Sequence, residues 1–201
     1  MFETQELPLT EDQILVDQAR QGDMNAFRDL VERNKQKIYF IALDMTGNHH
    51  DAEDISQDVF IKAYRSLSRF RGDARFSSWL YRITVNHCIE RSRKKSWKAV
   101  CTRENMDEKT AGLNTDCTGS EPIMDPEKYT EQSMIQLHIE KALCTLTERE
   151  KAVFILRHYH YLPLKEIARS LKVTEGTIKS TLFRALKRLQ KSLSFYQQEI
   201  I

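Results

Sequence analysis

Apolar residues recur every three or four positions through most of this chain of 201 residues, and that spacing limits its fold more than any other feature. Between residues 51 and 67 the repeat is Ile55, Val59, Ala63 and Leu67, which places four apolar side chains on one helix face. Gly (6) and Pro (4) are scarce, so the chain lacks the turn signals that a fold of many short strands needs. The pattern predicts an all-α protein.

Two helical stretches, residues 10–98 and 133–194, are separated by a segment without apolar periodicity. The separating residues, 99–132, are rich in Thr, Asn, Asp, Glu and Gly and are expected to form a flexible linker. We therefore expect two small helical domains on a tether, whose relative arrangement the sequence leaves undetermined. The helices expected in the first domain are 11–21 capped by Thr10, 24–45, 51–67, and one that is capped by Ser77 or Ser78 and ends near Lys95.

The formal net charge of +2 conceals a strong segregation of charge along the chain. Residues 61–103 hold twelve basic and two acidic side chains, and residues 142–193 hold eleven basic and four acidic ones. Between these blocks, residues 104–131 hold eight acidic and two basic side chains. Two basic blocks indicate two surfaces for a polyanion such as nucleic acid, although solvated helix faces would give the same counts. The motifs must decide between these interpretations.

No apolar run approaches the roughly 20 residues needed to cross a bilayer, and the acidic N-terminus does not resemble a signal peptide. The protein is therefore expected to be cytoplasmic, without direct membrane insertion. Its cysteines are dispersed, without the close spacing of a zinc site, and a reducing compartment disfavours disulfides. The four cysteines are Cys88, Cys101, Cys117 and Cys144. We expect all four to be ordinary thiols, and we expect neither a metal nor a cofactor. Whether Cys101 and Cys117 have a further role stays open.

Residues 164–189 have the layout of a helix-turn-helix. A short apolar helix ends at Leu171, Lys172 and Val173 form the turn, and Thr174 is placed to cap the second helix. The second helix is expected to bury Ile178, Leu182, Ala185 and Leu189. Its other face suits a DNA groove, because cations can meet phosphates and polar groups can donate to base edges. That face carries Lys179, Ser180, Phe183, Arg184 and Lys187.

Phe183 is the informative residue of this helix, since a phenyl ring is unusual on an otherwise polar face. The ring could pack on a thymine methyl group or a sugar. The alternative is that the ring turns into the domain core beside the preceding helices. A helix-turn-helix alone does not reveal what the protein does.

The helix of residues 51–67 has a second face that mixes acidic, amide and apolar groups, and this mixture suits a protein partner better than a nucleic acid. An ordinary charged helix surface is the competing interpretation. The face carries Asp54, Gln57, Asp58, Ile61 and Tyr64.

A basic loop and helix follow at residues 70–96. On this helix Trp79, Arg82, Asn86 and Arg93 fall on one side. An aromatic ring, an amide and guanidinium groups suit single-stranded DNA, because rings stack on bases and cations hold the backbone. Trp79 could also belong to the core, or serve both purposes.

Three segments together resemble an extracytoplasmic-function (ECF) sigma factor of the sigma-70 family. DAEDISQDVFIKAYRSL (51–67) resembles the core-binding helix of region 2, and FRGDARFSSWLYRITVNHCIERSRKKS (70–96) resembles its promoter-melting segment. LTEREKAVFILRHYHYLPLKEIARSLKVTEGTIKSTLFRALKRL (146–189) resembles region 4. The resemblance covers about three quarters of the chain and implies region 2 in residues 10–98 and region 4 in residues 133–194.

The resemblance implies a protein that binds core RNA polymerase and directs promoter-specific transcription initiation. Contacts to the β′ clamp helices would come from Asp54, Gln57 and Asp58. A base flipped from the −10 element would be held by Phe70, Arg71, Gly72, Asp73, Ala74, Arg75, Phe76 and Asn86, with Trp79 and Arg82 nearby. The −35 duplex would be read by Thr174, Thr177, Lys179, Ser180, Phe183, Arg184 and Lys187.

The implied partners are core RNA polymerase, through its β′ clamp helices and β subunit, promoter DNA, and an anti-sigma factor. The promoter sequence, regulon, inducing signal and anti-sigma identity are not readable from the chain. No phosphate-binding glycine loop, nucleophile constellation or metal motif indicates an enzyme. Two alternatives stay open: a stand-alone helix-turn-helix regulator that binds DNA as a dimer, and a nucleic-acid enzyme with Asp54 and Asp58 as a metal-binding pair.

Overall fold

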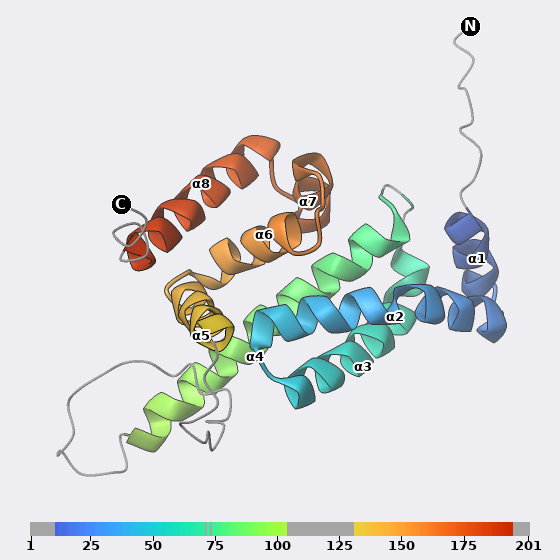
Figure 1. Cartoon of the computed structure of the whole chain (residues 1–201). Coiled ribbons are helices and arrows are strands. Elements are labelled where there is room, and N and C mark those ends of the chain that lie inside the picture. Colours follow the sequence, from blue (N-terminus) through green and yellow to red (C-terminus); the bar gives the residue numbers. More distant parts are fainter. Residues whose placement is uncertain (1–10, 71, 73, 104–130, 195–201) are drawn as a thin grey trace, which may run out of the picture.

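The computed structural model describes residues 11–70, 72, 74–103 and 131–194, and the regular elements of this described part are all helical. The predicted all-α fold is confirmed. Figure 1 shows the order of the elements: α1 (Glu11–Arg20), α2 (Met24–Thr46), α3 (His49–Ser66), the 3-10 turn η1 (Leu67–Arg69), α4 (Phe76–Arg103), α5 (Glu131–Cys144), α6 (Glu148–His158), α7 (Leu164–Leu171) and α8 (Glu175–Ser192).

Short side chains and one glycine set the ends of α2 and α3. The Asp23 carboxylate caps α2 by accepting from the backbone N–H groups of Asn25 and Ala26. Gly47 ends α2 with a φ of 68°, a left-handed conformation that costs glycine little. Asn48 then caps α3, so this helix begins at His49, two residues before the expected start. The sequence prediction missed this asparagine cap.

Helices α2, α3 and α4 lie side by side and form the core of the first region (Figure 1). The predicted apolar stripe of α3 is confirmed, because Ile55, Val59 and Ala63 are fully buried and Leu67 is 3 % exposed. Leu80 of α4 is also fully buried. The i, i+4 spacing in the sequence therefore identified the packing face of this helix correctly.

Both predicted ends of α4 are wrong. The helix begins at Phe76, and the expected cap Ser78 is buried with its hydroxyl donating to Glu166 of α7 instead. At the other end α4 passes Lys95 and continues to Arg103, because no Gly or Pro interrupts it. The first residues of the expected linker are thus helical, as are its last two in α5, and residues 104–130 lie outside the described part.

The second region contains the predicted helix-turn-helix in α7 and α8. Lys172 ends α7 with a φ of 55°, and the Thr174 hydroxyl caps α8 by accepting from the backbone N–H of Thr177 at 3.2 Å, as predicted. The buried face of α8 differs from the prediction at one position, because Thr181 is 7 % exposed whereas Leu182 is only half-buried. The buried face of α8 is therefore rotated slightly from the face that the apolar pattern predicted.

The two regions are packed against each other in one hydrophobic core, which the sequence did not predict. Ile155 and Leu156 of α6 and Ile167 of α7 are fully buried in the same cluster as the core of α2–α4. Polar contacts join the regions as well: Lys151 Nζ donates to the Met45 carbonyl at 2.8 Å, Ser92 to Glu148 at 2.7 Å, and Ser78 to Glu166 at 2.9 Å, while His160 and Asp44 are 2.9 Å apart. We call this packing the closed arrangement.

Candidate nucleic-acid interface

The outer face of α8 presents every residue that the sequence assigned to duplex DNA. All seven side chains are exposed, and Phe183 is 68 % exposed, so its ring does not lie in the domain core. One of the two interpretations of Phe183 is thereby excluded. The exposed set is Thr174, Thr177, Lys179, Ser180, Phe183, Arg184 and Lys187.

A buried carboxylate lies beneath the basic face of α8. Glu150 caps α6 in a reciprocal capping box with Thr147: its backbone N–H donates to the Thr147 hydroxyl, and its carboxylate accepts from the Thr147 backbone N–H at 3.0 Å. Its oxygens also lie 3.5 Å from Arg188 and 4.0 Å from Arg184. Burial raises the pKa of Glu150, but the hydrogen bonds from Thr147 and the charges of Arg188 and Arg184 outweigh it, so the pKa lies below its ordinary value. The ionised carboxylate links the start of α6 to the cations of α8.

Trp79 is the centre of an aromatic cluster at the start of α4. The ring is half-buried, and its centroid lies 5.0 Å from that of Phe70 and 5.6 Å from that of Phe76. Phe70 is 7 % and Phe76 is 3 % exposed, so both rings support Trp79 from the core and neither faces solvent. The sequence prediction had placed both among the residues that hold a base.

The rest of the expected base-holding loop is only partly described. Arg75 is exposed, Gly72 and Ala74 are half-buried, and Arg71 and Asp73 lie outside the described residues. Further along α4, Arg82 is half-buried and Asn86 is exposed. The helix brings these two to the side of Trp79 at spacings of three and seven residues.

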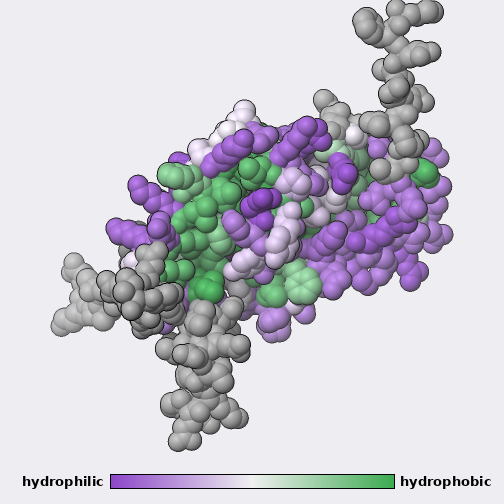
Figure 2. All heavy atoms as spheres, turned by 45° about the horizontal axis from the view of Figure 1, so that its top comes forward, coloured by the Kyte–Doolittle hydropathy of each residue, from purple (hydrophilic) through white to green (hydrophobic). Residues whose placement is uncertain are grey.

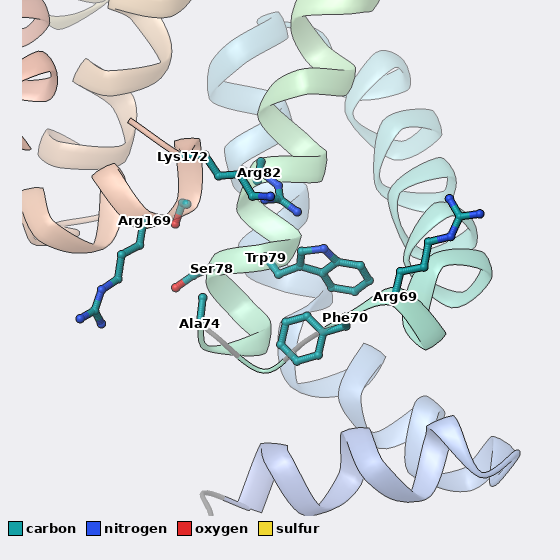
Figure 3. A pocket seen from close by; sticks show the side chains of 9 residues that line it. Arg69, Phe70, Ala74, Ser78, Trp79, Arg82, Arg169 and Lys172 are labelled. Carbon is teal, nitrogen blue, oxygen red and sulfur yellow. The ribbon is translucent and has the colours of Figure 1, made fainter. Parts of the chain in front are cut away.

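A cavity of about 540 Å³ adjoins Trp79 and Arg82 (Figure 3). Its wall includes three residues of the second region, Arg169, Ser170 and Lys172, which sequence reasoning did not connect with α4. No local signal could have found them, because they reach the cavity only through the packing of α7 against α4.

The mixed face of α3 is exposed at Asp54, Gln57 and Asp58. Arg91 of α4 donates to the Asp54 carboxylate at 3.1 Å, and the His87 Nε2 lies 3.2 Å from the Asp58 carboxylate. Burial and the nearby Lys62 charge lower the pKa of His87. The acids at positions i and i+4 of α3 thus meet partners at i and i+4 of α4.

His87 and Arg91 were not predicted from the sequence to contact these carboxylates, although their i, i+4 spacing on the adjacent helix matches that of Asp54 and Asp58. Their contacts bear on the metal-binding alternative for Asp54 and Asp58. Within the described residues, no three His, Cys, Asp or Glu side chains are grouped so that they could hold a metal ion.

Figure 2 shows an apolar area on the surface of the second region, over the part where α6 and α8 lie. Leu186 of α8 is 43 % exposed, and Phe154 of α6 and Leu193 are half-buried. In the described part of the chain, no helix is both long and apolar enough to cross a membrane.

The cysteines differ from the expectation of ordinary thiols at one described position. Cys88 is free and buried, and burial raises its pKa to about 12. Cys144, at the end of α5, is disulfide-bonded. The expectation of a free thiol is therefore wrong for Cys144.

A helical region with an aromatic and basic face, joined to a helix-turn-helix region with a second basic face, is typical of a DNA-binding protein. Two family models identify the class as sigma factors of the sigma-70 family. The family model described as Sigma-70 region 2 matches residues 30–98, and that described as Sigma-70, region 4 matches residues 142–191.

Relatives of known function make the assignment more specific. The chain is 34 % identical to the ECF RNA polymerase sigma factor SigW of Bacillus subtilis (strain 168), over 89 % of this chain and 94 % of the relative. It is 30 % identical to the ECF RNA polymerase sigma-E factor of Escherichia coli (strain K12), over 90 % of this chain and 94 % of the relative. The chain belongs to the ECF sigma factors of the sigma-70 family, which direct transcription initiation as subunits of RNA polymerase and are not enzymes.

Solved structures share this fold at lower identity. CnrH in complex with the cytosolic domain of CnrY aligns with a TM-score of 0.62 at 21 % identity, over 91 % of this chain and 97 % of that chain. The sigma factor RpoE in complex with the anti-sigma factor NepR from Bartonella quintana aligns with a TM-score of 0.58 at 23 % identity, over 84 % and 96 %.

Proposed function

We propose that the two basic faces of this sigma factor act on two promoter elements, α8 on the −35 duplex and α4 on the melted −10 strand. The observation that carries this proposal is the 68 % exposure of Phe183 in the middle of a cationic helix face. An apolar ring held in water among cations gains most when it reaches a thymine methyl group or sugar in a groove.

On α8 the roles divide by chemistry. Lys179 and Lys187 neutralise phosphates, while Ser180 and Arg184 donate to base edges beside Phe183. Thr174 and Thr177, at the start of the helix, lie where backbone N–H groups favour a phosphate. Arg184 also lies 4.0 Å from the buried Glu150 carboxylate beneath this face.

On α4 the half-buried Trp79 offers its indole to an unstacked base, and the buried rings of Phe70 and Phe76 hold it in place. Arg82 meets the strand's phosphates, and Asn86 reads a base edge. The loop of residues 70–76 completes the pocket for a base flipped from the −10 element. Contacts to flipped bases then supply the free energy that opens the duplex.

Core polymerase is bound through the mixed face of α3, with Asp54, Gln57 and Asp58 on the β′ clamp helices. The half-exposed Ile61 and Tyr64, at 48 % and 46 %, add apolar area to the same face. The apolar surface over α6 and α8 suits the β subunit. Residues 10–98 and 133–194 act as separate binding domains, and residues 99–132 connect them.

An anti-sigma factor is the proposed inhibitory partner, since the RpoE of Bartonella quintana, which shares the fold, is complexed with one. It would cover the polymerase and DNA faces. The chain acts in the cytoplasm, where its polymerase and promoters are found.

The proposal is tested by mixing the purified protein with core polymerase, recovering the complex, and transcribing a pool of promoters. Complex formation with transcripts from a defined promoter class is expected. The Asp58→Ala variant should lose polymerase binding, whereas Asp29→Ala, an exposed aspartate on α2, should not. A folded protein that fails to bind core and instead protects a dimeric footprint on DNA would make it a stand-alone regulator.

A further inference from the structure

The cavity beside Trp79 lies at the seam of the two regions. Arg69, Phe70, Ala74, Ser78, Trp79 and Arg82 come from the first region, and Arg169, Ser170 and Lys172 from the second. At about 540 Å³ it has the size of a small-molecule site. Because α7 forms one wall, the cavity exists only in the closed arrangement.

Among the described residues, the lining is strongly cationic and contains no acidic side chain. Four of its nine described residues are Arg or Lys, and none of these four makes an ion pair with a described acidic side chain. Figure 3 shows Arg82 and Lys172 reaching toward each other across the seam, above the Trp79 indole. Two like charges that border one cavity favour an anion between them.

Ser170 supplies a second, independent sign of a ligand. The residue is 2 % exposed, and its Oγ has no hydrogen-bond partner within the described residues. A buried hydroxyl left without a partner costs free energy, so such a group needs an explanation. The hydroxyl of Ser78, which also lines the cavity, donates to Glu166 instead.

The cavity also has an aromatic side. The Trp79 indole borders it, with Phe70 packed at a centroid distance of 5.0 Å. An indole face next to unpaired cations is the combination that binds a base together with a phosphate.

We propose that the closed arrangement binds a nucleotide in this cavity. The base stacks on Trp79, and the phosphates are held by Arg82 and Lys172, with the Ser170 hydroxyl donating to a phosphate oxygen. Since these groups come from both regions, the ligand stabilises the closed arrangement. A mononucleotide fits better than a continuous strand because α7 closes one side.

The regulatory consequence rests on the proposed function. Trp79 and Arg82 belong to the surface assigned to the −10 strand, so a bound nucleotide excludes that strand. The nucleotide would therefore hold the sigma factor inactive until core polymerase separates the regions.

The test uses the full chain and adenosine triphosphate as the probe, with calorimetric titration. Ser170→Ala removes only an unpartnered hydroxyl, so the fold is expected to keep its stability. Lys172→Asn removes a cation at a left-handed position that Asn tolerates. Each variant should bind about tenfold more weakly, since a charged hydrogen bond contributes about that factor. Lys165→Gln, an exposed lysine of α7 outside the cavity, should bind like the wild type.

Absence of binding to the wild type, or unchanged affinity in both cavity variants, would overturn the proposal. Binding of inorganic triphosphate as tightly as adenosine triphosphate would overturn the nucleotide assignment, because the indole would then contribute nothing. The titration contains neither DNA nor polymerase, so its outcome is independent of promoter recognition. Competition with a fluorescent single-stranded −10 oligonucleotide then tests the consequence by itself.

Discussion

The hydroxyl of Ser78 on α4 donates a hydrogen bond to the carboxylate of Glu166 on α7, with 2.9 Å between the oxygens. The two residues are 88 positions apart and join α4 to the first helix of the helix-turn-helix. Burial and the nearby charge of Glu166 raise the pKa of the adjacent Tyr81. This hydrogen bond thus connects region 4 to the start of α4, the helix that carries Trp79.

Replacing Glu166 with Ala should loosen the closed arrangement. The buried Ser78 hydroxyl would lose its partner, at a cost of about 1–3 kcal/mol. The radius of gyration from small-angle X-ray scattering should increase. Glu53→Ala, which removes an exposed glutamate of α3, serves as the control and should leave the radius unchanged. Equal radii for all three proteins would show that this hydrogen bond does not hold the regions together.

The Phe183→Ala variant should weaken −35 recognition without affecting stability. A side chain that is 68 % exposed makes few contacts in the folded chain, so the change in unfolding free energy should stay within about 0.5 kcal/mol. Binding of holoenzyme to promoter duplex should weaken by about 1 kcal/mol. Gln190→Ala, at an exposed position of the same helix outside the assigned DNA face, is the control. Equal effects of both variants would argue against a specific contact by Phe183.

Arg184→Ala should reduce transcription that depends on the −35 element while leaving polymerase binding intact. If Arg184 also meets a phosphate, the slope of log affinity against log salt should fall in magnitude by about 1. The measurement is mobility shift of holoenzyme on duplex at several salt concentrations. Parallel loss of polymerase binding would indicate misfolding, because Arg184 also lies 4.0 Å from the buried Glu150.

Asn86→Ala should change the −10 base preference and slow formation of the open complex. The side chain is exposed, so the fold should be unaffected. Permanganate footprinting on promoters with each base at the flipped position measures both effects. An unchanged preference and unchanged melting rate would remove Asn86 from the base pocket.

Glu150 should make the stability of region 4 pH-dependent. Because its pKa in the folded chain lies below the ordinary value of 4.5, its contribution is fully present above that value. The contribution is lost as the pH falls through the lower, folded pKa. Thermal unfolding followed by circular dichroism should show a steeper loss of stability with acid for the wild type than for Glu150→Gln. Parallel pH profiles would contradict this role of the capping carboxylate.

Local signals in the chain predicted local structure well. The stripe from Ile55 to Leu67 is buried and Thr174 caps α8, because helical periodicity and a capping hydroxyl act between residues only a few positions apart. The prediction that Ser78 could cap α4 was wrong because it also rested only on neighbouring residues in the sequence. Its hydroxyl is used by Glu166, a residue that no local pattern could associate with it.

In the candidate site, too, some features were predicted from local spacing and others were not. The exposed faces of α3 and α8 were assigned correctly as exposed, because helix geometry places their residues from spacing alone. The burial of Phe70 and Phe76 was not foreseen, because an aromatic residue in a loop faces solvent or core according to the helices around it.

The sequence by itself determined the helices, the helix-turn-helix and the sigma-factor family, since each rests on residue types at short, regular spacing. Only the tertiary structure decided how the regions meet. It placed Lys172 and Ser170 at the side of Trp79 and Arg82, and so created a cationic, aromatic cavity that neither region contains alone. Contacts between residues some ninety positions apart depend on the burial of apolar faces against one another, which spacing along the chain does not specify.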